Sequence, residues 1–293
     1  MSDVAVERRS HDRWDEAVAV SNGTIELLAP TSVGPRIVHF GVEGEENEFR
    51  LFGEDRADWP LVGGHRLWHA PEDPSRTHVP DLDPVEVRLF EDGVELRRSA
   101  HDRTGIEKAI TVRMAAEGAS VEVTHELTNR GAWPIEFAPW AISVLRPGGM
   151  AVLPLSSQDD PNAVAPDRSI TYWPYSTPGD ERLAYGDDRI SVVQESACDG
   201  PLKVGTSPGD CWVAYRLDDH AFRKDFECVP EEPYPDRDSG AAVYTNAEML
   251  ELETLGPLRT VDPDESVEHV ETWTLVDDVD GPSDVQGASP REI

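Results

Sequence analysis

Two glutamates near the end of the chain have the spacing that puts two carboxylates on one face of a β-strand. In the segment 249–257, Glu251 and Glu253 alternate with leucines, and a period of two predicts a strand with one apolar and one acidic face. Charged side chains mostly lie in water, so a solvated strand face in an acidic protein is the simplest interpretation. The functional alternative is a cleft in which one of the two carboxylates is a general base.

A second set of reactive side chains lies in residues 59–83, a segment dense in Gly, Pro, His and Trp that predicts an irregular loop. Aromatic and histidine side chains concentrated in a loop are a functional hint. The spacing of His65 and His69 would suit zinc only on a helix, which the neighbouring glycines and proline argue against, so we expect no metal site. Arg66 and Trp68 supply a fork of donors and a flat apolar face, which suit a neutral polyhydroxylated ligand. A packed, tryptophan-rich loop is the alternative for the same residues.

The sequence lacks the motifs of nucleophilic and nucleotide chemistry. It contains no G-x-S-x-G elbow, no glycine-rich phosphate loop and no dinucleotide fingerprint, so we expect no cofactor. The three cysteines, Cys198, Cys211 and Cys228, have no C-x-x-C spacing, which indicates neither a disulfide framework nor a zinc knuckle. We predict that they are buried free thiols.

The elements that must position these side chains are short strands. Asn22-Gly23 and Asp92-Gly93 each separate two apolar runs, which is the strongest local signal for a hairpin. No amphipathic helix longer than two turns is evident. His125 falls on the apolar side of a cleanly alternating strand, where a hydrogen-bonded core histidine is the simpler interpretation and a catalytic one the alternative. We predict strands at residues 17–20, 25–28, 36–42, 49–52, 85–90, 94–98, 106–114, 121–128, 135–145, 150–155, 169–173, 190–194, 211–217, 222–229, 243–255 and 267–276.

Many short strands with turn signals between them predict an all-β fold, and at this length a large antiparallel β-sandwich. We divide the chain into a polar N-terminal segment, residues 1–15, a single sandwich domain, residues 16–277, and a flexible C-terminal tail, residues 278–293. The hydrophobic content of 38% is enough for a sizeable core.

The net charge of −32 is the strongest compositional signal. The 293 residues contain 26 Lys and Arg against 58 Asp and Glu, and lysine occurs only at positions 108, 203 and 224. An acidic surface poor in lysine predicts a protein that stays soluble in concentrated salt, where screening removes most self-repulsion, and that loses compactness in low salt. A melting temperature that does not change with salt would contradict this halophilic interpretation.

The same composition bears on partners and location. A strongly acidic surface disfavours nucleic acid and anionic membranes, because both bind basic surfaces. Residues 1–14 lack the apolar core of a secretory signal, and no run approaches the roughly 18 apolar residues of a membrane span. We therefore expect a cytoplasmic protein whose partner is a small molecule.

Several short motifs occur in the order found in the galactose mutarotase (aldose 1-epimerase) superfamily. That superfamily has an early Asn-Arg that contacts sugar hydroxyls, a late Leu-Glu-Thr that contains the catalytic base, a Pro-Gly-Glu turn, and a last strand with an aromatic centre. The matching stretches here are Gly63-Gly64-His65-Arg66, Leu252-Glu253-Thr254, Asp262-Pro263-Asp264-Glu265 and Glu271-Thr272-Trp273-Thr274-Leu275. Each motif is short and their order is the specific part, but the chain resembles the superfamily over residues 18–276.

The resemblance implies a β-supersandwich with a carbohydrate ligand. By position, Glu253 matches the superfamily's base and Arg66 its sugar-binding arginine. Glu251, on the same strand face, could raise the pKa of Glu253 by like-charge repulsion. We expect four further residues to line the same binding site: Trp68, His78, Trp140 and Glu251.

One position departs from the superfamily's pattern. The superfamily's catalytic acid is a histidine in a strand that matches residues 139–145, and Trp140 stands at its place. An indole cannot donate a proton at neutral pH, so we expect a loop histidine, His65 or His69, with His78 as a further candidate, to protonate the ring oxygen. In that mechanism the base opens the ring at the anomeric carbon and re-closure inverts the anomer. The alternative is a non-catalytic sugar-binding protein in which Trp140 is a stacking platform.

Overall fold

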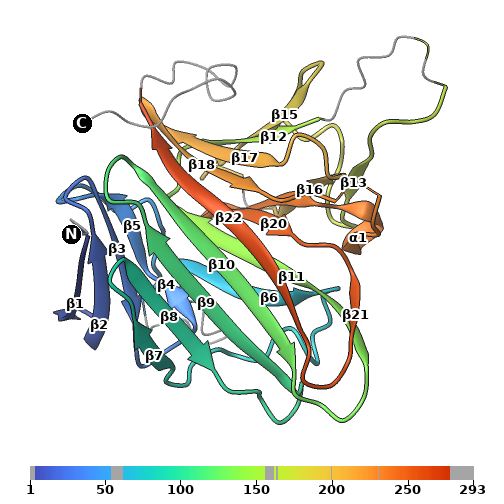
Figure 1. The fold of residues 1–293 in the computed structure, drawn as a ribbon. Coiled ribbons are helices and arrows are strands. Elements are labelled where there is room, and N and C mark those ends of the chain that lie inside the picture. The colour runs from blue at the N-terminus through green and yellow to red at the C-terminus, as the bar shows by residue number, and fades with distance from the viewer. Residues whose placement is uncertain are drawn as a thin grey trace.

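The computed structural model describes residues 4–53, 62–155, 162, 164–198, 200–229 and 231–277, and these residues are mostly β-structure. Their one helix, α1 (Pro235–Asp238), has four residues. The strands of these described ranges form antiparallel sheets of ten, eight and four strands (Figure 1). The predicted all-β antiparallel sandwich is confirmed. No helix among the described residues is long and apolar enough to cross a membrane.

The ten-stranded sheet contains the long strand β22 near its middle (Figure 1). β22 pairs with β10 from Ser120 opposite Thr274 to Thr128 opposite Ser266, so the last strand of the fold is held along its length. In spatial order the strands are β14 (Leu183–Tyr185), β15 (Arg189–Val193), β12 (Met150–Pro154), β17 (Trp212–Leu217), β18 (His220–Phe226), β22 (Ser266–Val276), β10 (Ser120–Asn129), β9 (Ile106–Met114), β8 (Gly93–Arg98) and β7 (Glu86–Leu89).

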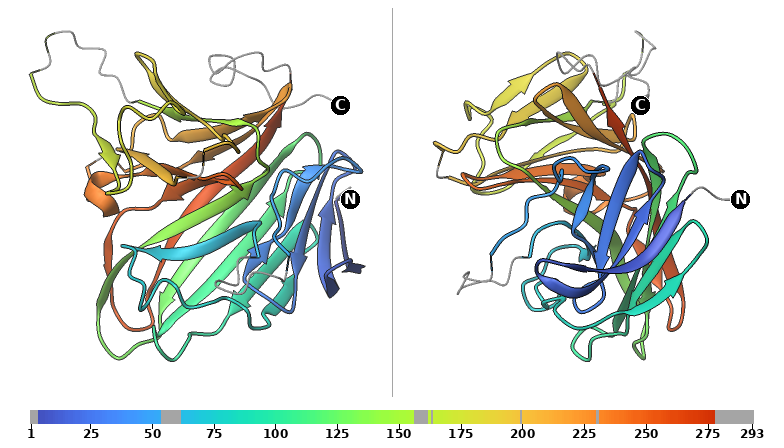
Figure 2. Two further views of the ribbon diagram at one scale, coloured as in Figure 1. Left: turned by 180° about the vertical axis from the view of Figure 1, so that it is seen from behind. Right: turned by 90° about the vertical axis from the view of Figure 1, so that its left-hand side faces the viewer.

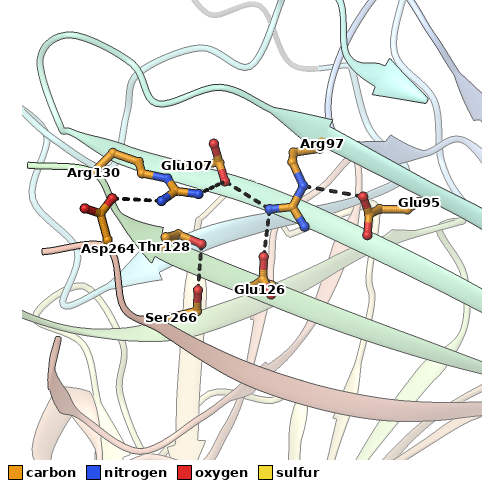
Figure 3. Close-up of polar contacts among 8 residues, drawn as sticks. All are labelled: Glu95, Arg97, Glu107, Glu126, Thr128, Arg130, Asp264 and Ser266. Atoms are coloured by element: carbon orange, nitrogen blue, oxygen red, sulfur yellow. Dashed lines mark hydrogen bonds and ion pairs between the residues drawn. The ribbon is translucent and has the colours of Figure 1, made fainter. Parts of the chain in front are cut away.

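The outer face of this sheet carries charged side chains that pair across strands (Figure 3). Arg97 on β8 donates to Glu107 on β9 at 2.9 Å and to Glu126 on β10 at 2.8 Å. Arg130 bridges Glu107 to Asp264 in the turn before β22. Exposed ion pairs of this kind contribute little stability individually, so their main effect is to offset local repulsion on an acidic surface.

The eight-stranded sheet brings together segments from the whole chain. Its main path is β13 (Ile170–Tyr172), β16 (Leu202–Thr206), β19 (Ala241–Thr245), β20 (Leu250–Leu255), β11 (Ile135–Leu145), β6 (His65–Ala70) and β4 (Arg36–Ile37), and β21 (Arg259–Val261) pairs with β11 outside it.

Strand β11 changes partner at its proline. Residues before Pro139 pair with β21 and residues after it pair with β20, while the β6 side is continuous. The Pro139 carbonyl accepts a hydrogen bond from Gly256 at 3.0 Å. A proline within a strand predicts an edge or a bulge; here the ladder on one side of β11 changes partner at Pro139, because proline has no N–H for a continuous ladder.

The four-stranded sheet lies at one end of the two larger sheets, as the blue strands in Figure 2 show. It has the order β1 (Ala5–His11), β2 (Trp14–Ser21), β3 (Ile25–Pro30) and β5 (His39–Val42). Strand β1 falls within the predicted polar segment 1–15, and among the described strands it pairs with β2 alone. The predicted tail, residues 278–293, lies outside the described residues.

All three sheets contribute to one apolar core. Val18 and Leu27 from the small sheet, Leu96 and Trp273 from the ten-stranded sheet, and Leu252 from the eight-stranded sheet belong to the same buried cluster. Aromatic rings fill its centre, where Phe40, Phe49, Phe222 and Trp273 have centroid separations of 5.4–6.4 Å. The core fixes the spacing of the two large sheets.

Two sequence expectations are corrected by the fold. Residues 65–70 form strand β6, although the surrounding glycines and prolines predicted an irregular loop. Cys211 and Cys228 are not free thiols: they form a disulfide with a Cα–Cα distance of 5.6 Å, because the β17–β18 hairpin brings its two ends together. Cys198 is a free cysteine as predicted, but it is half-buried and not buried.

Candidate functional site

One face of the eight-stranded sheet collects most of the residues that the sequence analysis singles out. In β6 and β20, a period of two places Arg66 and Trp68 on the same face as Glu251 and Glu253. The register supports this arrangement, since Ile142 on β11 lies opposite both Arg66 and Glu253. Trp140, Tyr244 and Lys203 project from the same face of β11, β19 and β16. We call these seven residues the site face: Arg66, Trp68, Trp140, Lys203, Tyr244, Glu251 and Glu253.

Glu253 is the most deeply placed acid of the site face, with 1% of its surface exposed. Its Oε2 accepts a hydrogen bond from the indole of Trp140 at 2.9 Å and lies 2.8 Å from the ammonium of Lys203. Its Oε1 is buried and has no hydrogen-bond partner among the described residues. Burial raises the pKa of Glu253 to about 7, because the opposing effect of Lys203 does not fully offset desolvation and Glu251 adds repulsion. The solvated strand face considered for these glutamates is therefore excluded.

Arg66 is buried and pairs with Glu251, the neighbour of Glu253 on the same face of β20. One terminal nitrogen donates to Glu251 Oε1 at 2.9 Å, and the guanidinium lies 4.4 Å from the Trp68 ring centroid. The other terminal nitrogen and Nε have no acceptor in the described part of the chain. A buried donor without a partner costs about 1–3 kcal/mol, so such groups mark a place where a ligand oxygen would be stabilising.

Aromatic side chains surround this polar centre. The Trp68 and Trp140 rings meet edge to face at 5.5 Å, and Lys203 Nζ lies 4.5 Å from the Trp140 centroid and 4.6 Å from that of Trp173. His78 lies at the margin, 5.4 Å from the Trp68 ring, with its Nε2 2.7 Å from Glu72. The structure thus brings six of the residues singled out in the sequence into one connected group: Arg66, Trp68, His78, Trp140, Glu251 and Glu253.

The structure does not bring His65 and His69 to Glu253. Both alternate with Arg66 and Trp68 along β6, so they lie on the opposite face, towards the core. Burial and the nearby Lys224 hold the pKa of His65 well below its usual value, and burial together with Lys108 lowers the pKa of His69 to about 4. Neutral, inward-facing imidazoles cannot protonate a ligand at Glu253, so the expectation of a catalytic His65 or His69 is not supported.

His65 instead belongs to a chain of buried hydrogen bonds. His125 Nδ1 donates to the His269 carbonyl at 2.9 Å, which leaves His125 Nε2 as the acceptor of a 2.7 Å bond from His65 Nε2. His65 Nδ1 then accepts from the Ser143 hydroxyl at 2.9 Å. The interpretation of His125 as a hydrogen-bonded core histidine agrees with this arrangement.

Glu271 on β22 is the acid at the centre of the same interior. It accepts hydrogen bonds from Lys224 at 3.1 Å, from Trp273 at 2.6 Å and from the Thr254 hydroxyl. Ligand atoms of His65, His125 and Glu271 lie within 4.8 Å of one another, a spacing that could hold a metal ion. The donor set does not fit one, because both Glu271 oxygens already accept hydrogen bonds and the ammonium of Lys224 already supplies the counter-charge.

Lys203 is the main site residue that the sequence analysis missed. The segment 202–206 was not predicted as a strand, so nothing placed Lys203 on the sheet. The available signal was scarcity: all three lysines of this arginine-rich chain are buried, and each contacts a carboxylate, in the pairs Lys108–Asp81, Lys203–Glu253 and Lys224–Glu271.

No protein-family model and no curated protein matches this chain. Solved structures do match it. A galactose mutarotase-like protein from Lactobacillus casei ATCC 334 has a TM-score of 0.58 at 10% identity, covering 88% of this chain and 99% of that chain. A galactose mutarotase-like protein from Clostridium acetobutylicum has a TM-score of 0.58 at 10% identity, covering 94% and 100%. A galactose mutarotase related enzyme from Lactobacillus acidophilus has a TM-score of 0.53 at 11% identity, covering 90% and 98%. The chain therefore has the galactose mutarotase-like fold, which confirms the fold that the resemblance implied.

Proposed function

We propose that the site face binds a carbohydrate and interconverts its anomers, with Glu253 as the general base. The observation that carries the proposal is the state of Glu253: a buried carboxylate that has one oxygen held by Trp140 and Lys203 and the other without a partner in the described structure. A sugar hydroxyl would supply the missing hydrogen bond, and the unpartnered nitrogens of Arg66 would bind neighbouring oxygens. The fold and the position of Glu253 in the Leu-Glu-Thr motif support the same assignment.

The pKa of Glu253 suits this role. A general base works best when its pKa lies near the operating pH, and burial raises that of Glu253 to about 7. The base accepts a proton only when it is ionised, so the catalysed rate should rise as the pH increases through about 7. A glutamate with an ordinary pKa would give a rate that is already constant there.

A second candidate function is sugar binding without turnover. It is favoured by Trp140, which donates to Glu253 and cannot supply the proton that ring opening needs. Under this alternative, sugars would change the tryptophan fluorescence of the site face while anomer exchange stayed at its uncatalysed rate.

Exchange measurements on Glu253 variants separate the two functions. Anomer exchange of glucose, galactose and their acidic derivatives would be followed by magnetisation-transfer NMR in high-salt buffer. We expect Glu253→Gln to lower the catalysed rate by about 10²–10⁴-fold, the usual contribution of a general base. Glu122→Gln, the same substitution at an exposed position of β10, is the matched control and should leave the rate unchanged. A Glu253→Gln variant as active as the unmodified protein would refute the role of Glu253.

A further inference from the structure

Ring opening needs a proton donor as well as a base, and the described residues around Glu253 offer few. Trp140 is an indole, and His65 and His69 face the core as neutral imidazoles. Burial raises the pKa of the Tyr175 and Tyr244 phenols, which makes them weaker acids than ordinary tyrosines. None of these groups can readily release a proton at neutral pH. His78, the third candidate acid, lies at the margin of the site face, beside Trp68 and Glu72.

Lys203 carries protons and touches Glu253. Its ammonium has three N–H bonds, and the carboxylate of Glu253, at 2.8 Å, is its one charged partner in the described part of the chain. The Trp140 and Trp173 rings, with centroids 4.5 and 4.6 Å from Nζ, hold it in place. Only 4% of Lys203 is exposed, so its remaining N–H groups are kept from bulk water. The base and this ammonium therefore lie side by side in the site face.

We propose that Lys203 is the catalytic acid of the site face and takes the place of the histidine that Trp140 displaces. This inference rests on the proposed function. The contacts of the Trp140 and Trp173 rings with Lys203 then have a role in catalysis, because they hold the ammonium beside the base. Trp140 serves both partners, since its N–H orients Glu253 and its ring face binds Lys203.

The step balances without any other reactant. Glu253 Oε1 takes the proton of the anomeric hydroxyl, and the electron pair of that O–H bond forms the C=O bond of the open chain. The bond between the anomeric carbon and the ring oxygen breaks, its electron pair stays on the ring oxygen, and that oxygen takes a proton from Lys203 Nζ. Glu253 and Lys203 are then both neutral, which a buried site favours over separate charges. Rotation about the first carbon–carbon bond and reversal of the steps give the other anomer and restore both residues.

Two substitutions at position 203 test the proposal, with glucose and galactose as probes. Lys203→Arg keeps a cation next to Glu253 but cannot release its proton, since guanidinium has a pKa above about 12. We expect it to bind the probes and to lose about 10²-fold or more of the catalysed exchange, the range in which general acids act. We expect Lys203→Ala to be inactive and to regain exchange with added ethylammonium, which can donate a proton from the space between the two indoles. Tetramethylammonium, a cation with no N–H, should not restore it.

The results distinguish this proposal from the proposed function. If Glu253→Gln is inactive while Lys203→Arg exchanges the anomers as fast as the unmodified protein, the acid is not Lys203 and the function stands. If tetramethylammonium restores Lys203→Ala as well as ethylammonium does, the cation alone matters and proton donation is refuted. If the unmodified protein exchanges no probe, both proposals fail together. Should Lys203→Ala not fold, Lys203→Arg still decides.

Discussion

Two buried groups, each made of a lysine, a glutamate and a tryptophan, lie on the two sides of β20. They differ in whether both oxygens of the glutamate have a hydrogen-bond partner. On the site face, Glu253 is held by Lys203 and Trp140; towards the core, Glu271 is held by Lys224 and Trp273. In the core group the Thr254 hydroxyl also donates to Glu271 Oε1. On the site face the second oxygen of Glu253 has no partner among the described residues.

The two glutamates also differ in their pKa values. Burial by itself would raise the pKa of Glu271, but the charge of Lys224, the nearby His125 and His269, and the Thr254 hydrogen bond together outweigh it and hold the pKa at about 2. Burial prevails at Glu253, where the pKa is about 7. The same three residue types thus form a permanently ionised structural group on one side of the strand and a titratable group on the other. A complete set of partners indicates a structural role, and a missing one indicates a site.

The core group also positions the site. Lys224 donates to the Leu252 carbonyl at 3.3 Å, and Thr254 is bound by Glu271 and by His269 at 2.8 Å. These contacts fix the residues on both sides of Glu253. The contacts of Lys224 and Glu271 therefore hold β20, the strand of the proposed base, from its core side.

Replacing each of the two lysines separately should show the largest difference in stability between the two groups. Lys224→Met leaves Glu271 buried without its counter-charge, and breaking such a pair costs about 3–5 kcal/mol of unfolding free energy. Lys203→Met should cost clearly less at neutral pH, because Glu253 already binds a proton near pH 7. Urea unfolding at pH 7 compares the two variants. Equal losses would mean that the two groups do not differ as described.

Without the Thr254 hydroxyl, Glu271 would lose one hydrogen-bond donor, and the core group would become more like the group around Glu253. Thr254→Val takes a hydroxyl donor from Glu271 and leaves its shape nearly unchanged. The pKa of Glu271 should rise towards its ordinary value, and stability should fall by about 1–3 kcal/mol, the cost of a hydrogen bond lost by a buried charged group. Because a depressed carboxyl pKa stabilises the fold above the unfolded pKa, the variant should also begin acid unfolding at higher pH. Unchanged acid unfolding would contradict the role of Thr254.

The smallest expected effect is a shift in the pKa of Glu253 when Trp140 loses its indole N–H. The hydrogen bond from Trp140 lowers the pKa of Glu253, so Trp140→Phe should raise it. A hydrogen bond of about 1 kcal/mol corresponds to less than about one pH unit. The rising part of the pH–rate profile should move upwards by that amount. A shift to lower pH would mean that the indole does not stabilise the carboxylate.

The alternation of side chains along a strand predicted the position of the two glutamates correctly, but it was not used for residues 65–70. Alternation in 249–257 put Glu251 and Glu253 on one face, and the structure agrees. The same period in His65–Ala70 would have separated His65 and His69 from Arg66 and Trp68, but glycines before the segment and a proline after it indicated a loop. The error in the proposed acid follows from that one choice.

Local sequence patterns could not predict contacts between segments that are far apart in the chain. Lys203 lies 50 positions before Glu253, in a strand of five residues that the sequence did not predict. It reaches the site because β19 pairs with β16 on one side and with β20 on the other. The disulfide could have been predicted more easily, because Cys211 and Cys228 lie in the two predicted strands 211–217 and 222–229, which follow each other closely enough to form a hairpin. Pairing the ends of that hairpin in register would have joined them.

The most direct test of the account is the titration of the two glutamates in one protein. Carbon-13 NMR of labelled glutamate carboxyl groups, assigned with the Glu253→Gln and Glu271→Gln variants, reports both midpoints. We predict that Glu253 titrates near pH 7 and that Glu271 stays ionised down to about pH 2. A Glu253 midpoint at or below about 4.3, the value of an ordinary glutamate, would contradict the assignment of Glu253 as the base of this site.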